Sequence, residues 1–245
     1  MSNLYYCELL KLWKSPIRFL MVLAGIAPVF FTVFPQFMDQ MAADAPVSWD
    51  LIILGNLSYF NLLIGIPLFY LITGYIFAYE YKHNIISQLF CYPNSRNSIL
   101  FAKFLAISTC IVITTAISFI GLLIIGFIWK SSGFEIQTLL GGVDLYIFSI
   151  ILQIFLIPFA ICLSISKKSM VLPVGVAIIL VIVTGFTTGT TVSQIFPWAI
   201  PLNVILHLGN HATMENIMFF TGIVILILFC IVTTWYSKRL YNKID

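Results

Sequence analysis

The chain has 245 residues, of which 61% are hydrophobic and only 9% are charged. A soluble domain carries about 25% charged residues, so the composition excludes an ordinary soluble protein and indicates that lipid covers most of the surface. The net charge of +3 is attributed to membrane topology and to contact with anionic lipid headgroups, which argues against nucleic-acid binding. We therefore predict an all-α integral membrane protein, built as a single transmembrane domain over residues 1–245.

The N-terminal segment 3–15 has polar and apolar residues at helical spacing. Tyr6 and Trp13 fall on one face, whereas Glu8 and Lys11 fall on the opposite face. This pattern predicts an interfacial amphipathic helix that lies on the inner leaflet of the membrane, with its aromatic side chains in the headgroup layer.

Six long apolar segments follow, and each has the length of a helix that crosses a bilayer. They cover residues 17–37, 57–79, 99–129, 144–165, 170–191 and 216–236. Eleven of the twelve Lys and Arg residues lie before them, after them, or in every second connector, and only Lys130 lies on the other side. The positive-inside rule then places both termini in the cytoplasm.

The segment from Gly185 to Leu208 is apolar but interrupted by Gly, Thr and Pro residues. We predict a broken outer loop or a short re-entrant hairpin before the sixth span, held against the other spans because lipid does not tolerate exposed irregular backbone. Gly185 and Gly189 also form a GxxxG pattern. It indicates either a close-packed interface with a second membrane subunit or ordinary packing within one chain.

The spans contain few ionisable residues. Lys103 lies one turn inside the start of the third span, where we expect its side chain to snorkel to the surface. No charged residue is predicted at mid-membrane, which argues against a proton- or sodium-coupled carrier. The sequence has no Gly-Lys dipeptide and therefore no P-loop, and HExxH and GxSxG are absent. We expect no catalytic residue and no cofactor in this chain.

One group of residues has the types that bind zinc. His207, His211 and Glu215 are spaced four residues apart, so they would share a face of a helix. The alternative is a polar surface loop, which we favour because Gly209 and Asn210 weaken a helix here. No metal site is predicted.

The connector 80–98 is the best candidate for contact with a cytoplasmic partner. Ile86, Leu89 and Phe90 belong to the stripe of a short amphipathic helix, which Pro93 and the residues after it end as a turn. The pattern alone leaves two interpretations open. The connector either binds a partner or lies on the headgroups without one.

The run from residue 80 to 96, together with a later lysine, resembles the segment after the second span of ABC-2 type permeases. These are the membrane subunits of ATP-binding-cassette exporters. The family shows Glu-aromatic-basic-x-Gly-Thr, then an apolar helix, Pro-Val-Ser-Arg, and a Lys. The matching residues are Glu80, Tyr81, Lys82, Pro93, Ser95, Arg96 and Lys103, whereas Asn84, Ile85 and Asn94 replace the Gly, Thr and Val. The compact length particularly resembles permeases of bacterial lantibiotic-immunity and bacitracin-resistance exporters.

The resemblance implies a coupling helix seated in a groove of a separate ATPase subunit. The residues assigned to ATPase coupling are Glu80, Lys82, Ile86, Leu89, Phe90, Pro93 and Arg96. The apolar members would anchor the helix, and the charged members would flank it with ion pairs to the partner. The complex would contain two ATPase copies, which bind ATP and Mg²⁺, and a second permease, identical or homologous. Its substrate would be an amphipathic peptide antibiotic or drug-like compound, exported across a bacterial plasma membrane.

Two other classes of function remain as alternatives. One is a membrane assembly or sensor protein that transports nothing. The other is an ion-coupled secondary carrier, because the carbonyl groups of broken helices can bind sodium without a charged side chain.

Overall fold

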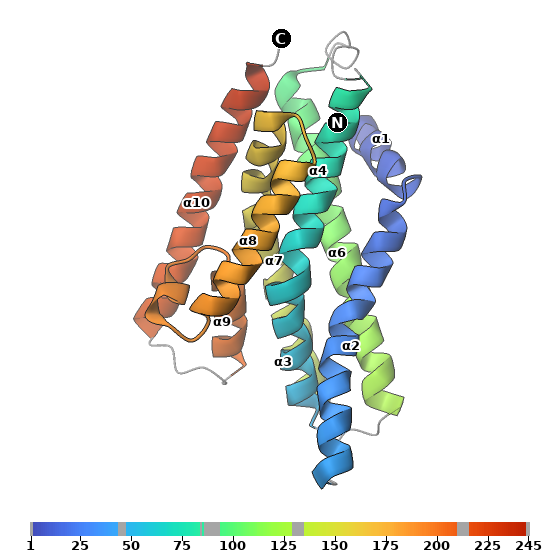
Figure 1. Ribbon diagram of the computed structural model, residues 1–245, viewed down its shortest axis with the longest axis vertical. Helices are drawn as coiled ribbons and strands as arrows, with labels where there is room; N and C mark the ends of the chain where they lie inside the picture. Colours follow the sequence, from blue (N-terminus) through green and yellow to red (C-terminus); the bar gives the residue numbers. More distant parts are fainter. Residues whose placement is uncertain are drawn as a thin grey trace.

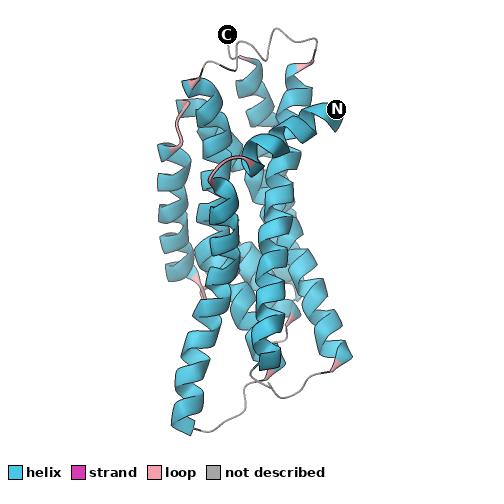
Figure 2. Ribbon diagram, turned by 90° about the vertical axis from the view of Figure 1, so that its right-hand side faces the viewer, coloured by secondary structure: helices cyan, strands magenta, loops and turns pink. Residues whose placement is uncertain are grey.

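The computed structural model describes residues 2–43, 48–83, 85, 94–128, 135–209 and 216–243. All regular secondary structure within these ranges is helical (Figure 2). The helices form an elongated bundle, and the start of α1 lies at the same end as the end of α10 (Figure 1). In chain order the elements are α1 (Ser2–Trp13), α2 (Ile17–Ala43), α3 (Trp49–Tyr59), η1 (Phe60–Gly65), α4 (Ile66–Lys82), α6 (Arg96–Ile128), α7 (Ile136–Lys167), α8 (Val171–Thr187), η2 (Thr191–Gln194), α9 (Ile200–Leu208) and α10 (Asn216–Asn242).

Five helical stretches are long and apolar enough to cross a membrane. They are Ile17–Gln36, Trp49–Lys82, Arg96–Ile128, Ile136–Lys167 and Phe219–Asn242, and the 17-residue α8 is a shorter apolar helix. Large apolar side chains also cover the outside of the bundle, such as Phe19, Leu23, Val171 and Val232, each more than 60% exposed. Water would not tolerate so much contiguous apolar surface, so the fold is that of a multi-pass membrane protein.

Helices α3, η1 and α4 follow one another without a break. The predicted span 57–79 lies inside this stretch, but the helix begins at Trp49, within the region predicted as a connector. Trp49 is 2% exposed, and its ring packs against Phe127 of α6 at 5.3 Å between centroids. A Cβ atom at Gly126 would lie only 2.4 Å from the indole. This packing of an aromatic ring over a glycine explains why the helix starts early.

The middle of this stretch, Phe60–Gly65, is π-helical. In a regular α-helix the ring of Pro67 would collide with the carbonyl group four residues earlier, and a wider turn avoids the collision. Asn61 in this turn donates to Ser149 Oγ at 3.0 Å and accepts from Gln153 Nε2 at 2.8 Å. A buried polar network therefore joins the π-helical turn to α7.

Helix α8 ends at Thr187, before the end of the predicted span at residue 191. Thr188 Oγ1 donates to the Thr184 carbonyl and Thr190 Oγ1 to the Thr187 carbonyl, each at 2.7 Å. The same two carbonyls also accept the N–H groups of Thr188 and Thr190, each at 3.0 Å, so the hydroxyl groups add second bonds at the helix end. Gly189 then adopts a φ of +83°, which glycine takes without steric cost, and the chain turns.

The segment after this turn is not another long helix. It contains the short elements η2 and α9, and α9 packs against α3 and α7. All residues from Ile200 to Ile205 are buried, and Asn203 Nδ2 donates to the Ser193 carbonyl at 2.9 Å. The backbone between α8 and the end of α9 is thus held against the bundle by side-chain packing and by hydrogen bonds.

Candidate functional site

Four charged side chains from three helices meet near the end of the bundle that carries α1. Glu8 and Lys11 come from α1, Glu80 from the last turn of α4, and Lys103 from the early part of α6, and we call these four residues the charge cluster. Lys103 Nζ donates to Glu80 Oε1 and, at 3.0 Å, to Glu8 Oε1. Lys11 Nζ lies 2.9 Å from Glu8 Oε1 and 3.1 Å from Glu80 Oε1. Two ammonium groups therefore balance two carboxylates.

Three members of the charge cluster are withdrawn from solvent. Lys103 is 0% exposed, Glu80 is 1% exposed and Glu8 is 4% exposed. The expectation that Lys103 snorkels to the surface is wrong, because two carboxylates meet its ammonium group inside the protein. The ring of Phe77 adds a cation–π contact, at 5.8 Å from the Lys103 Nζ to the ring centroid. Isolated buried charges are costly, so each of these ions depends on the others.

The charge cluster explains which face of α1 packs on the protein. The aromatic residues Tyr6 and Trp13 are 62% and 56% exposed, whereas Glu8 is buried. The predicted helix is present, and the face that packs on the bundle carries Glu8 and the apolar Leu12, with Tyr6 and Trp13 outward. Tyr5 adds a hydrogen bond of 2.7 Å between its hydroxyl group and Thr109 Oγ1 of α6. Helix α1 is therefore fixed to α6 by both charge and hydrogen bonding.

The electrostatics of α1 favour the ionised forms. Burial alone would raise the pKa of Glu8, but the ammonium groups of Lys103 and Lys11 outweigh it and hold the pKa below its usual 4.5. Burial would likewise lower the pKa of Lys11, but the carboxylates of Glu8 and Glu80 raise it above the usual 10.5. Both groups thus remain charged throughout the neutral range.

These shifts predict an acid-sensitive contribution to stability. A lowered folded-state pKa means that the contribution of Glu8 is present above pH 4.5 and is lost as the pH falls through the folded-state pKa. We expect the unfolding temperature of the full chain in detergent to fall below pH 4.5, and to fall less steeply in Glu8→Gln. Glu135→Gln alters an exposed carboxylate and should keep the wild-type profile. Equal acid sensitivity of Glu8→Gln and the wild type would contradict a role for Glu8.

The charge cluster joins the two helices, α4 and α6, that precede and follow the connector. Glu80 lies in the last turn of α4, and Lys103 lies about two turns after the start of α6. Ser95 caps the start of α6, because its Oγ accepts the Ser98 N–H at 3.2 Å. Arg96 Nη1 donates to the Asn242 carbonyl at 2.9 Å and thereby joins the same end of α6 to α10. The two flanks of the connector are thus joined to each other, to α1 and to α10.

The residues predicted to couple to an ATPase have different environments. Lys82 is exposed and Arg96 is half-buried, so both can be reached from outside the bundle. Glu80 is buried, and its carboxylate is bound within the chain by Lys103 and Lys11. Its ion pair with a partner stays a prediction. The remaining four, Ile86, Leu89, Phe90 and Pro93, lie outside the described residues.

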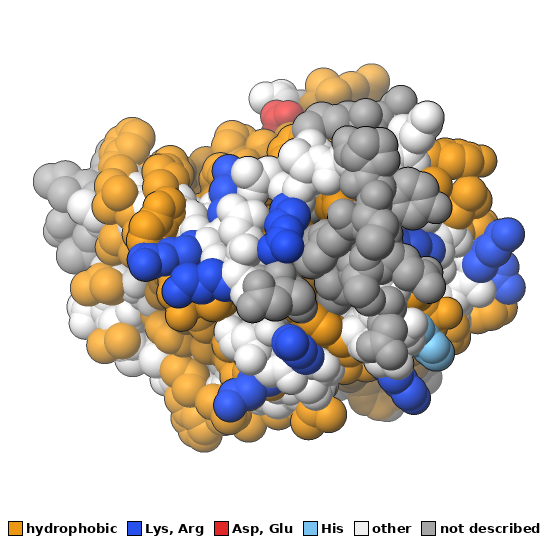
Figure 3. Space-filling model, turned by 90° about the horizontal axis from the view of Figure 1, so that it is seen from above, with side chains coloured by type: hydrophobic (Ala, Val, Ile, Leu, Met, Phe, Trp, Pro, Cys, Tyr) orange, Lys and Arg blue, Asp and Glu red, His pale blue; other side chains and the backbone are white. Residues whose placement is uncertain are grey.

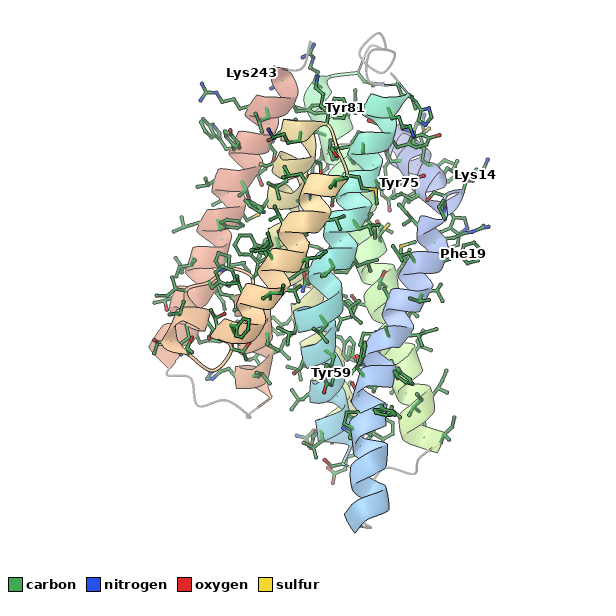
Figure 4. All side chains as sticks on the ribbon, viewed as in Figure 1. Lys14, Phe19, Tyr59, Tyr75, Tyr81 and Lys243 are labelled. Carbon is green, nitrogen blue, oxygen red and sulfur yellow. The ribbon has the colours of Figure 1, made fainter. Side chains whose placement is uncertain are left out.

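Several basic side chains lie at this end of the bundle. Seen end-on, Lys and Arg residues are spread over the surface, and almost no acidic side chain is visible (Figure 3). Lys243 extends from the end of α10, and Lys14 projects sideways beyond α1 (Figure 4). This surface suits an acidic partner or anionic headgroups.

The other predicted sites have less support. Gly185 lies in α8 and Gly189 beyond its end, so they share no helical face, and nothing lies within 4 Å of a Cβ built at either. The ring of His207 packs on Phe219, at 5.0 Å between centroids. His211 and Glu215 lie outside the described residues, and the described part of the chain holds no group of three His, Cys, Asp or Glu side chains that could bind a metal.

Together, these features define a polytopic α-helical membrane protein in which buried charges join the two flanks of a connector. Residues 4–185 match the family described as ABC-2 family transporter protein, and the chain belongs to this family. It is also 29% identical, over 156 residues, to the bacitracin transport permease protein BCRB of Bacillus licheniformis, and the aligned region covers 64% of this chain and 75% of that relative. The similarity to ABC-2 type permeases inferred from the connector is therefore confirmed.

Proposed function

We propose that this chain is the membrane-spanning permease subunit of an ATP-binding-cassette exporter. The topology would have six spans, with α8 as the fifth, and both termini in the cytoplasm. The connector between α4 and α6 would be the docking site for a separate ATPase subunit, which binds ATP and Mg²⁺ and carries out the hydrolysis. Two ATPase copies and a second permease, identical or homologous, would complete the transporter.

The observation that carries this proposal is the ion pairing between the two flanks of the connector. Glu80 and Lys103 are buried together, so α4 and α6 are joined directly beside the connector. A force applied to the connector would therefore move both helices as one unit and would not simply bend a loop. Helix α1 belongs to the same unit through Glu8.

The end of α4 that lies away from the connector begins at the π-helical turn Phe60–Gly65. This turn interrupts the regular α-helical hydrogen bonding between α3 and α4. Interruptions of this kind are frequent sites of bending. We infer that α4 and α6 tilt about this region when the ATPase subunits close. The ATPase drives transport only if it binds the two membrane conformations with different affinities.

The similar protein and the membrane surroundings support a proposal for the substrate class. The similar protein is named as a bacitracin transport permease. An amphipathic peptide antibiotic partitions into the bilayer, where a multi-pass permease reaches it directly. We therefore propose export or membrane extraction of an amphipathic peptide in self-protection.

Two substitutions in the connector test the proposed coupling. We expect the gene of this chain to neighbour that of an ATPase subunit, and the two proteins to co-purify. Leu89→Asp places a charge in the proposed anchor and should weaken ATPase binding roughly 30-fold. Arg96→Glu reverses the charge at the connector's end and should abolish stimulation of ATP hydrolysis by the permease. Both effects are measured as co-purified ATPase and as hydrolysis rate in reconstituted vesicles.

The matched control is Lys14→Glu, which makes the same charge reversal at an exposed position outside the connector. It should leave ATPase binding and stimulation unchanged. The proposal fails if the chain purifies without an ATPase and both connector variants behave like this control. Uptake into vesicles that follows an imposed proton or sodium gradient without ATP would instead support an ion-coupled carrier.

A further inference from the structure

Two neighbouring hollows at the basic end of the bundle share one residue, Lys238 of α10. The first is a groove of 180 Å³ between α6, α7 and α10. Its lining residues are Asn97, Leu100, Phe101, Phe104, Pro158, Ile161, Thr234, Ser237 and Lys238. The second is a shallower basic hollow of 380 Å³, lined by Trp235, Lys238, Arg239, Asn242 and Lys243. An apolar space therefore opens directly beside a positively charged one.

The groove has a polar mouth and an apolar interior. On α6 the lining residues follow one helical face from Asn97, near the helix start, to Phe104, about 10 Å deeper along the axis at 1.5 Å per residue. On α10, Lys238 lies at the mouth and Thr234 lies one turn deeper. This order matches that of an amphiphile, with a polar group at the end of the bundle and an apolar chain toward its middle.

The hydroxyl groups in the groove do not make its interior polar. Ser237 Oγ donates to the Pro158 carbonyl at 2.9 Å, and Thr234 Oγ1 donates to the Cys230 carbonyl at 2.7 Å. Their protons are therefore engaged by backbone, so the groove presents mainly Phe, Leu and Ile side chains. Phe101, 48% exposed, forms part of its outer wall.

The basic hollow has side chains that are typical of the headgroup region of a membrane. Trp235 is 60% exposed on the outside of α10, and exposed Trp residues are typical of the membrane–water interface. The Arg239 guanidinium lies 5.5 Å from the centroid of that ring. Lys238 and Lys243 are exposed beside it, and among the residues that the structure describes no carboxylate lines either hollow.

We propose that the two hollows bind an anionic phospholipid, with one acyl chain in the groove and the phosphate at Lys238, Arg239 and Lys243. The apolar groove selects a lipid tail over a soluble anion, and the positive charge of the three basic side chains selects an anionic headgroup over a zwitterionic one. A bound lipid would fill the junction of α6, α7 and α10, next to the Arg96–Asn242 contact at the connector. The site requires neither an ATPase nor a particular orientation in the membrane.

The experiment measures retained lipid on the purified full-length chain. The protein is delipidated in detergent, titrated with phosphatidylglycerol or phosphatidylcholine, and examined by native mass spectrometry. We expect saturable retention of one phosphatidylglycerol per chain and much weaker retention of phosphatidylcholine. Lys238→Gln should weaken phosphatidylglycerol binding about fivefold, the effect of one Lys near an anionic surface, and leave phosphatidylcholine binding unchanged.

Controls separate the site from general electrostatic attraction. Lys167→Gln removes an exposed charge at the same end, outside both hollows, and should retain wild-type binding. Thr234→Phe should fill the groove and lower retention, with circular dichroism showing an intact fold. Inorganic phosphate should not displace the lipid. Equal retention of the two lipids, equal effects of the two lysine changes, displacement by phosphate, or cross-linking of a second chain across the groove would each overturn the proposal.

Discussion

Replacing Lys103 by methionine is expected to lower the stability of the chain by about 3–5 kcal/mol, the usual cost of breaking a buried ion pair from one side. Lys103 is the member of the charge cluster with no exposed surface, and it donates to both carboxylates. Without it, Glu8 and Glu80 would share only Lys11, whose side chain is 39% exposed. The effect is measured as the unfolding temperature in detergent and as the yield of monodisperse protein.

Two further variants show whether an unbalanced buried charge causes the loss of stability in Lys103→Met. Lys14→Met removes an exposed lysine nearby and should change stability by no more than about 0.5 kcal/mol. Combining Glu80→Gln with Lys103→Met leaves Glu8 paired with Lys11, so the double variant should be more stable than Lys103→Met alone, with a coupling energy of about 0.5–3 kcal/mol. If Lys103→Met unfolds at the same temperature as Lys14→Met, the charge cluster is not what holds α1, α4 and α6 together.

The charge cluster also shows how far the sequence could predict this site. Glu80 and Lys103 were both singled out by the resemblance, but their direct pairing was not predicted. Glu8 and Lys103 are 95 positions apart in the sequence, and no periodic pattern in the chain predicts that these charges meet. The available signal was a lone lysine inside an apolar segment, which demands a buried partner or an exit to water. Choosing between these outcomes required the position of α1.

The prediction of helices was most accurate where apolar periodicity and length decide the structure. The segments from Ile17, Arg96 and Val171 match predicted spans closely at their starts. The prediction of helices was least accurate where a specific contact extends or bends a helix. The early start at Trp49 depends on the absence of a side chain at Gly126, and the π-helical turn depends on Pro67 and on polar partners from α7. Such contacts are tertiary, so local sequence patterns do not reveal them.

Introducing an alanine at Gly25 is expected to destabilise the chain by about 1–3 kcal/mol, the typical cost of overpacking a close helix contact. Gly25 lies where α2 crosses α6. A Cβ atom there would lie 2.7 Å from Ile117 Cγ2 and 2.9 Å from the Thr114 carbonyl oxygen. The isoleucine could change its rotamer, but the carbonyl belongs to the backbone of α6, so the two helices would have to separate. Small residues at such crossings allow the close approach that drives helix packing in membranes.

Two other glycines make this prediction specific to the contact. A Cβ at Gly121 would meet only Val29 Cγ2 at 3.3 Å, so Gly121→Ala should have a smaller effect, because a methyl group can yield. Gly175 in α8 has nothing within 4 Å, and Gly175→Ala should be neutral or stabilising by up to about 1 kcal/mol. We expect the unfolding temperatures to fall in the order Gly175→Ala, Gly121→Ala, Gly25→Ala. All three changes add the same methyl group to a helix. A decrease in unfolding temperature that follows this order must therefore come from how closely α2 and α6 approach each other. Equal unfolding temperatures would mean that the two helices are free to separate at Gly25 without cost.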